Sequence, residues 1–309
     1  AQVERVVWRV IPEPTARLAA MQTGQGDVTQ YIPPVALESL RRVPSITLHT
    51  QPNYFWDFFM GFKVDKPVVS DRAIRRAVHM AVDRTALTRA VWFGSAVPAR
   101  NIVNPNTLDY DAESERLVPD FDPAAAARTL DEAGWRVGPD GIRVKDGQRA
   151  SFLTYGIATL EGQRQGEIIQ QALRRVGIEM RVQLFDATVA WGRLATQEFD
   201  AFFLSYPYFS AGDALNLYWH SRARPTPNRM NWNNPQTDAW LEEARSATDP
   251  AVRARALANV QRQLAEESPW LTIAREQLFV ATSNRVQGVR AHGLYGIGVY
   301  KGLDMRIVR

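Results

Sequence analysis

Five side chains that could bind or act on a ligand fall in one loop and at the start of the helix predicted after it. They are Tyr206, Tyr208, Ser210, Asp213 and Asn216. The loop follows four apolar residues at 201–204, which is typical of a short buried strand. Aromatic rings at the end of such a strand either fill a core or line a pocket that a ligand completes. Composition alone favours the core role and leaves a binding site formed by these five residues as the alternative, with Asp213 also expected to cap a helix over residues 214–220.

Catalytic chemistry is poorly supported by the sequence. Nucleophilic catalysis by serine needs a neighbouring base, usually histidine, but there are only four histidines and no G-x-S-x-G motif. A glycosidase would need two convergent carboxylates, for which Asp200 and Asp213 are the candidates. Because Asp200 is expected at a strand start and Asp213 at a helix cap, we predict no catalytic residue and no enzyme activity.

Metal and cofactor sites have equally little support. His79 and Asp83 have the helical spacing of two zinc ligands, but arginines surround them, which favours a surface ion pair. The alternating acids at residues 109–115 lack the glycine that lets a calcium loop turn, which favours a solvated loop. No glycine-rich phosphate-binding motif is present. We therefore predict no metal and no cofactor.

Composition favours a globular protein with a large core. The 309 residues are 45% hydrophobic and include nine tryptophans, and this length suggests about two domains. The formal net charge is only +4 and no basic run stands out, so we predict no nucleic-acid partner. Cysteine is absent, which excludes disulfides and thiolate metal sites. Neither a run of the roughly 20 apolar residues that span a membrane nor a leader-like pattern occurs in the sequence.

Alternating strand and helix patterns predict an α/β fold. Residues 151–155, 161–176 and 178–185 read as a strand, a helix and a strand, which a right-handed crossover makes parallel. Parallel strands bind ligands beyond their carboxyl ends, which here are the loops at residues 156–162 and 206–213. Trp191, on a helix predicted at residues 188–195, is expected in the core.

The clearest single helix is predicted at residues 70–84, with Ser70 as its N-cap. Apolar residues recur at helical spacing on one side, at Ile74, Ala77, Val78 and Ala81. Arginines and a histidine fall on the other side, which is expected to be solvated: Arg72, Arg75, Arg76 and His79. The same reading predicts further strands at residues 3–11, 27–32, 46–51, 53–62, 270–274 and 278–281, and further helices at residues 16–23, 35–42, 85–92, 121–134, 235–246 and 250–267.

Several stretches resemble the family 5 extracellular solute-binding proteins of peptide- and nickel-type ABC importers. The most specific are DRAIRRAVHMAVDRTAL and NPQTDAWLEEARSATDPAVRARALANVQRQLAEESPWLTI. The resemblance implies an α/β, periplasmic-binding-protein-like lobe of class II type, with a mixed β-sheet flanked by helices, plus part of a second lobe. Residues 1–60 and 276–309 would belong to the first lobe and residues 61–275 to the second. The stretch VERVVWRVIPEPTARLAAMQTGQGDV matches the middle of the family's first lobe, so we expect this chain to be the C-terminal portion only.

The resemblance also implies a function. Members of this family capture a peptide or other small polar solute between two lobes by hinge closure and deliver it to a membrane permease, outside the cytoplasm. We therefore expect a periplasmic or extracytoplasmic, monomeric binding protein. In the family, the loop that matches residues 206–213 lies at the mouth between the lobes and faces the ligand, so the five residues named first are expected to bind it. The aromatic strand of the family runs near the crossing between the lobes, which makes Phe55 and Trp56 further ligand-binding candidates.

Two departures from the family bear on the identity of the solute. Peptide binders carry an aspartate for the peptide's amino terminus where this chain has Ser210, and the arginine of some oligopeptide binders is matched by Phe203. A buried ammonium without a counter-charge is unfavourable by several kcal/mol, so a neutral solute such as an oligosaccharide, or a cation held elsewhere, is as consistent as a peptide. The alternative from another class is a truncated structural or interaction module, whose aromatic loop would contact a protein partner.

Overall fold

The computed structural model describes residues 3–30, 32–208, 210–290 and 304–308, and the side chains of all of these except Pro14, residues 51–56 and Pro207. The chain forms two compact units. Unit 1 comprises Ala1–Phe55, Trp92–Val97 and Arg275–Arg309, and unit 2 comprises Trp56–Val91 and Pro98–Ala274. The sequence placed these divisions after residues 60 and 275, and it did not assign residues 92–97 to the first part.

Unit 1 is built on short elements packed on parts of two long strands, β2 (Ile46–Phe62) and β10 (Trp270–Ser283). Its other elements are α1 (Pro14–Gln22), β1 (Val28–Gln30), η1 (Pro34–Ala36), α2 (Leu37–Leu40), β3 (Ala96–Pro98), β11 (Val286–Gln287) and β12 (Arg306–Ile307). Strand β1 pairs antiparallel with β10, with Val28 opposite Thr282. Met21, Leu40 and Phe279 belong to the core that these elements enclose.

The strand predicted at residues 3–11 is wrong. This segment forms neither helix nor strand, and Val7, Trp8 and Val10 are exposed. Its β-branched residues favour a strand only where a neighbouring strand bonds their backbone groups, and within the described part of the chain no strand pairs with it. The glycine-rich segment at residues 291–303 lies outside the described residues.

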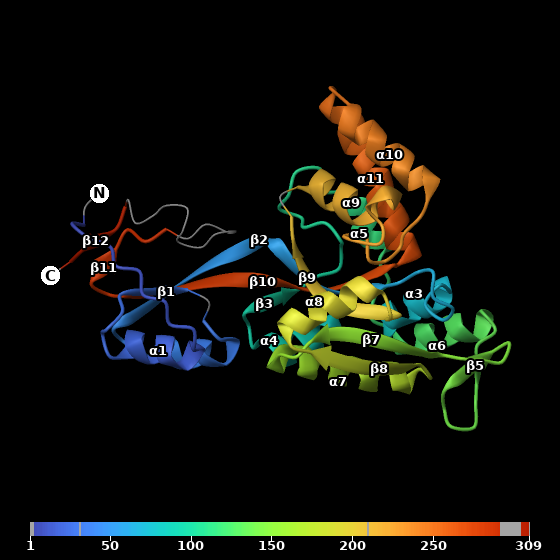
Figure 1. Cartoon of the computed structure of the whole chain (residues 1–309), viewed down its shortest axis with the longest axis horizontal. Coiled ribbons are helices and arrows are strands. Elements are labelled where there is room, and N and C mark those ends of the chain that lie inside the picture. The colour runs from blue at the N-terminus through green and yellow to red at the C-terminus, as the bar shows by residue number, and fades with distance from the viewer. Residues whose placement is uncertain (1–2, 31, 209, 291–303, 309) are drawn as a thin grey trace. The chain divides into compact units, whose positions relative to one another are not determined.

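Unit 2 contains a mixed β-sheet, as predicted for the fold class (Figure 1). Its strand order is β10, β2, β9 (Ala201–Pro207), β7 (Ser151–Ile157) and β8 (Glu179–Phe185). Strand β7 runs parallel to both β8 and β9, which confirms the predicted crossover, whereas β9 runs antiparallel to β2. The separate strands predicted at residues 46–51 and 53–62, and at 270–274 and 278–281, are continuous in β2 and β10.

The helices around this sheet form two groups (Figure 1). The first group is α3 (Arg72–Ala81), α6 (Pro123–Glu132) and α7 (Leu160–Arg175), and the second is α5 (Ala112–Leu117), α9 (Ala211–Trp219), α10 (Pro235–Ser246) and α11 (Pro250–Glu267). The remaining elements are α4 (Arg84–Trp92), α8 (Ala187–Thr196), η2 (Ser221–Ala223) and the small sheet of β4 (Arg136–Val137), β5 (Arg143–Lys145) and β6 (Gln148–Arg149). Among the described residues, no helix is both long enough and apolar enough to cross a membrane.

Helix α3 begins one residue later than predicted. Asp71, and not Ser70, is its N-cap, because the Asp71 carboxylate accepts a hydrogen bond from the N–H of Ala73 at 2.8 Å. The same carboxylate accepts hydrogen bonds from Trp135 and Lys145, each at 2.9 Å. The cap therefore also links α3 to the region after α6.

The prediction of a solvated arginine face on α3 is wrong for two residues, since Arg75 and His79 are both buried. The end of α11 packs on this side of the helix, and Arg75 donates to the backbone oxygen and the carboxylate of Glu267. Burial lowers the pKa of Arg75 to about 10, so it stays charged at neutral pH. His79 bonds Arg84 and lies in the interior, and this excludes the predicted surface ion pair with Asp83.

Candidate functional site

The carboxyl ends of β7, β8 and β9 lie at the same edge of the sheet, because the three strands run parallel. Large apolar side chains are exposed on the helices that follow these strands. They are Leu160 on α7, Val189 and Trp191 on α8, and Leu217 on α9. Open parallel sheets bind ligands outside this edge, so the edge is the first place in unit 2 to look for a binding surface.

An aromatic–arginine cluster formed by Trp191, Tyr206, Tyr218 and Arg229 lies at this edge. The ring of Tyr206 stacks on that of Tyr218, with centroids 4.3 Å apart. Arg229 donates from Nη1 to the Tyr206 hydroxyl at 2.5 Å, and its guanidinium lies 5.4 Å from the centroid of the Trp191 ring. The cluster thus joins the end of β9, α8, α9 and the loop before α10.

Exposure divides this cluster into a base and an accessible part. Tyr206 and Tyr218 are buried at 6% and 5% exposure, while Trp191 is 47% exposed and Arg229 is half-buried. The prediction that Trp191 lies in the core is therefore wrong. The guanidinium of Arg229 lies near the Trp191 ring and is bonded by the buried Tyr206 hydroxyl, while Tyr218 stacks on Tyr206. A solute approaching this edge would meet the indole and the guanidinium first.

Burial raises the pKa of Tyr206 and, strongly, that of Tyr218, with the nearby Arg229 charge acting in the opposite direction. Both phenols therefore stay protonated at neutral pH. The Tyr206 oxygen accepts from Arg229, which leaves its own O–H directed elsewhere as a donor.

The second predicted tyrosine, Tyr208, has a structural position. It is 3% exposed, donates to Asp57 on β2 at 2.9 Å and accepts from the backbone N–H of Asn104 at 2.8 Å. These contacts fix the loop after β9 to the interior of unit 2. A direct contact between Tyr208 and a solute stays a prediction.

Helix α9 begins earlier than predicted, and its cap is a different residue. Ser210 is the N-cap and accepts from the N–H of Asp213 at 3.0 Å, so the expected capping role of Asp213 is wrong. Asp213 lies in the first turn, where its charge favours the helix N-terminus. Asn216 donates to the backbone oxygen of Gly212 at 2.9 Å.

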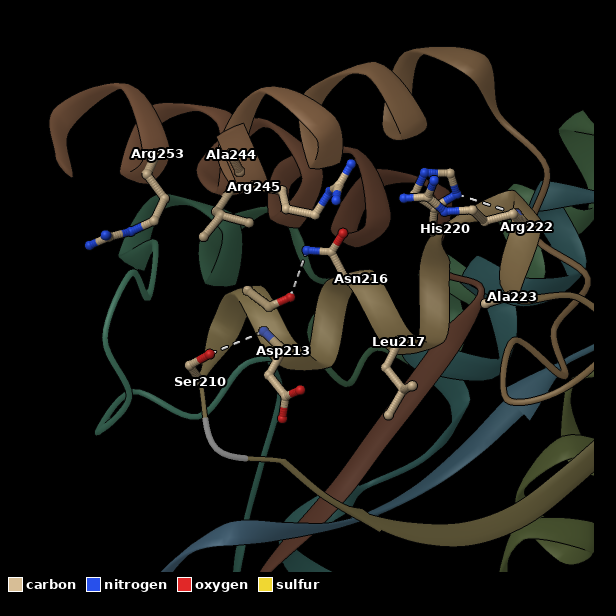
Figure 2. Close-up of a pocket in the computed structure, with 12 residues that line it drawn as sticks. Ser210, Asp213, Asn216, Leu217, His220, Arg222, Ala223, Ala244, Arg245 and Arg253 are labelled. Carbon is tan, nitrogen blue, oxygen red and sulfur yellow. Dashed lines mark hydrogen bonds between the residues drawn. The ribbon is translucent and has the colours of Figure 1, made fainter. Parts of the chain in front are cut away.

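Ser210, Asp213 and Asn216 line an open pocket of about 610 Å³ between α9, α10 and α11 (Figure 2). Figure 2 shows Asn216 directed toward α10 and α11, whereas the side chains of Asp213 and Leu217 point away from them. The other polar walls come from His220, Arg222, Arg245 and Arg253. The structure thus brings three of the predicted site residues together at this pocket, while Tyr206 belongs to the aromatic–arginine cluster.

Three other residues considered from the sequence have distinct positions. Phe55 and Trp56 belong to β2, where Trp56 pairs with Pro207, but their side chains lie outside the described residues. Asp200, a candidate carboxylate for hydrolysis, accepts from the N–H of Leu153 at 2.7 Å and so connects β9 to β7.

The alternating acids take part in ion pairs. Asp109 bonds Arg253 and Asp111 bonds Arg262, and Asp111 also caps α5. Within the described part of the chain, no three histidine, aspartate or glutamate side chains gather closely enough to hold a metal ion.

Sequence reasoning missed Arg229 and Tyr218 as site residues. Arg229 follows a proline-rich stretch with no periodic pattern, and Tyr218 reads as one of several apolar residues on a short helix. One indirect signal was present in the sequence. A tyrosine at the end of a buried strand, Tyr206, needs packing and hydrogen-bond partners, but the sequence does not say which residues these are.

Comparison with known proteins places this chain in a family. The family model described as bacterial extracellular solute-binding proteins, family 5 Middle, matches residues 1–226. Protein XP55 of Streptomyces lividans is 32% identical over 236 residues, which are 72% of this chain and 41% of that protein. The glutathione-binding protein GsiB of Escherichia coli (strain K12) is 27% identical over 296 residues, which are 93% of this chain and 55% of that protein. The chain thus spans about half the length of these relatives.

Solved structures share the fold. The oligopeptide-binding protein AppA from Bacillus subtilis, in complex with a nonapeptide, superposes with a TM-score of 0.79 at 20% identity, over 97% of this chain and 60% of that chain. NikA from Brucella suis, in complex with Fe(III)-EDTA, gives a TM-score of 0.81 at 23% identity, over 97% of this chain and 61% of that chain. The family match and the shared fold together show that this chain belongs to the bacterial extracellular solute-binding proteins of family 5.

Proposed function

We propose that this chain is part of the extracytoplasmic solute-binding subunit of an ABC importer. It captures a peptide-like or other small polar solute between two lobes and delivers it to a membrane permease, without catalysing a reaction. Membership of family 5 supports this role. The names of similar proteins agree with a peptide-like solute, since one relative is a glutathione-binding protein and one similar structure is in complex with a nonapeptide.

The observation that carries the proposal is the exposed Trp191 ring on a rigid, buried base. Ligand pockets combine apolar and aromatic walls with a few fixed polar groups, and the aromatic–arginine cluster supplies both. Because Tyr206 and Tyr218 are buried and stacked, we expect them to keep their positions when a solute binds. An ordered base of this kind reduces the conformational entropy that binding would otherwise lose.

Thermal unfolding of the full-length protein with a library of peptides, glutathione, oligosaccharides and metal chelates tests the proposal. A true solute binds the folded state alone and raises the melting temperature in a concentration-dependent way. We expect one chemical class to do so, with the protein monomeric before and after binding. Hydrolytic turnover of that class, measured on the purified protein, would contradict the proposal.

A second function is favoured by a specific observation. The exposed Leu160, Val189, Trp191 and Leu217 could form the contact surface of an interaction module. Such a module would form a persistent dimer or complex, and its melting temperature would not change with any solute of the library. Analytical ultracentrifugation alongside the thermal screen therefore separates the two functions.

A further inference from the structure

Arg229 is held in a fixed position at the binding edge. Its Nη1 donates to the Tyr206 hydroxyl at 2.5 Å, and its guanidinium lies 5.4 Å from the Trp191 ring centroid and 6.0 Å from that of Tyr206. Stacked arginines lose little conformational freedom on binding, because the planar group is already oriented. The remaining N–H groups of this side chain are therefore presented in one geometry.

Other arginines of unit 2 differ from Arg229 in their partners. Arg222 and Arg245 both bond Glu242, and Arg253 bonds Asp109. Among the described residues, no carboxylate lies within 4.0 Å of Arg229, and its buried Nε has no hydrogen-bond partner. Arg229 thus has a half-buried positive charge with no carboxylate at ion-pair distance in the described part of the chain.

A half-buried charge without a counter-charge is unfavourable, and a solute anion would remove that penalty. The Tyr206 O–H adds a second donor beside the guanidinium, since its oxygen already accepts from Nη1. Two adjacent donors suit a carboxylate, which accepts hydrogen bonds on both oxygens. Arg229 and Tyr206 therefore fit an anionic group of a solute, and the exposed Trp191 ring fits a planar or apolar group next to it.

We propose that Arg229, with Tyr206, determines solute specificity by binding a carboxylate group of the solute, while the adjacent apolar part of the solute lies against Trp191. The inference rests on the proposed function and specifies its solute class. The site then selects solutes that carry a carboxylate group.

Matched pairs of solutes test this inference on the full-length protein. Di- and tripeptides, each as the free acid and as the C-terminal amide, are titrated while tryptophan fluorescence is followed. We expect the free acid to bind at least about tenfold more tightly than its amide, as is typical of a charge-assisted hydrogen bond. Arg229→Gln should remove this preference, because it lowers the affinity for the free acid and leaves the affinity for the amide unchanged. Arg229→Lys should keep part of it, because the charge stays but the planar fork is lost.

Arg116→Gln is the matched control, because it removes an exposed arginine that already has a carboxylate partner, Glu113, and that belongs to neither the cluster nor the pocket; we expect it to leave the preference unchanged. Equal affinity of acid and amide for the unaltered protein would overturn the inference, and this comparison needs no variant to fold. A preference that survives in folded Arg229→Gln would also overturn it. If only neutral oligosaccharides raise the melting temperature, the carboxylate inference fails and the proposed function stands. If no solute does, both fail.

Discussion

The hydroxyl of Tyr208 donates to Oδ2 of Asp57 at 2.9 Å, at a point where both side chains are buried in unit 2. The same hydroxyl accepts from the backbone N–H of Asn104 at 2.8 Å. One oxygen atom therefore connects strand β2, the segment before α5 and the end of β9. Tyr208 is therefore fixed between Tyr206, at the end of β9, and the start of α9, which carries Tyr218.

Removing this hydroxyl should destabilise the protein. Tyr208→Phe keeps the ring but leaves a buried carboxyl group and a buried amide without the phenol, which costs about 2–3 kcal/mol in the free energy of unfolding. Urea denaturation followed by circular dichroism measures it. Tyr155→Phe is the control, because Tyr155 packs in the same core and its hydroxyl makes no hydrogen bond among the described residues. Equal effects of the two substitutions would contradict the structural role of Tyr208.

The cap of α3 gives a second prediction. Asp71→Ala removes the N-cap together with the partners of Trp135 and Lys145, so we expect a loss of about 2 kcal/mol or more. Ser70→Ala should change stability by less than about 0.5 kcal/mol, because Ser70 is exposed. Denaturant midpoints of the two variants decide between them. A larger loss of stability for Ser70→Ala than for Asp71→Ala would show that Ser70, and not Asp71, is the N-cap.

A third prediction concerns Gly61, which pairs with Phe202 across β2 and β9. A Cβ at Gly61 would lie 2.7 Å from the buried Phe202 ring, so Gly61→Ala should destabilise by about 1–3 kcal/mol through overpacking. Gly192 lies inside α8 with no heavy atom within 4 Å of the corresponding Cβ. Gly192→Ala should therefore stabilise by about 0.5–1 kcal/mol. Calorimetry of both variants checks the opposite signs, and a shift in the same direction would contradict the packing described for Gly61.

Local signals in the sequence were sufficient to predict several elements with their bounds. Helices α10 and α11 begin after Asn234 and Asp249, each followed by proline, and both run over the predicted residues. The capping side chain and the fixed φ of proline act within one turn, so no distant contact is needed. The parallel pairing of β7 and β8 was predictable for a similar reason, since the handedness of the crossover is nearly invariant.

The sequence could not supply contacts made by distant segments. Arg75 is buried because Glu267, nearly 200 residues later, accepts its hydrogen bonds. Trp191 is exposed because its partner is Arg229, on a loop without a pattern, and not a core residue. The shared carboxyl edge of β7, β8 and β9 follows from the predicted crossover, and its binding role stays a prediction. The cluster at that edge depends on four segments that no local rule brings together.

The ion pairs of Glu242 predict a dependence of stability on pH. Its hydrogen bonds with Arg245 and then His220 lower its pKa from 4.5 to about 2. Between these values the unfolded chain binds a proton that the folded chain does not, so stability is present above about pH 4.5 and is lost as the pH falls toward 2. Glu242→Gln should flatten this part of the curve. Urea unfolding at a series of pH values measures both slopes, and parallel curves would contradict the assignment.

The last prediction concerns Trp191, whose ring is the most accessible part of the aromatic–arginine cluster. Trp191→Ala should lower the affinity for any solute found in the thermal screen by about 10- to 100-fold, as expected for a tryptophan at the centre of a binding surface. The stability of the free protein should change little. The ring is half exposed, and the cation–π contact with Arg229 contributes only about 0.5–1 kcal/mol.

Trp8→Ala provides the matched control, because Trp8 is an exposed tryptophan of unit 1 outside the cluster. Isothermal titration calorimetry on the full-length protein compares the two variants with the unaltered chain. If affinity depends on the cluster, only Trp191→Ala weakens binding, and the melting temperatures of the free variants stay close to each other. Unchanged affinity in Trp191→Ala would mean that the solute binds elsewhere, and the carboxyl edge of β7, β8 and β9 would then not be the binding surface.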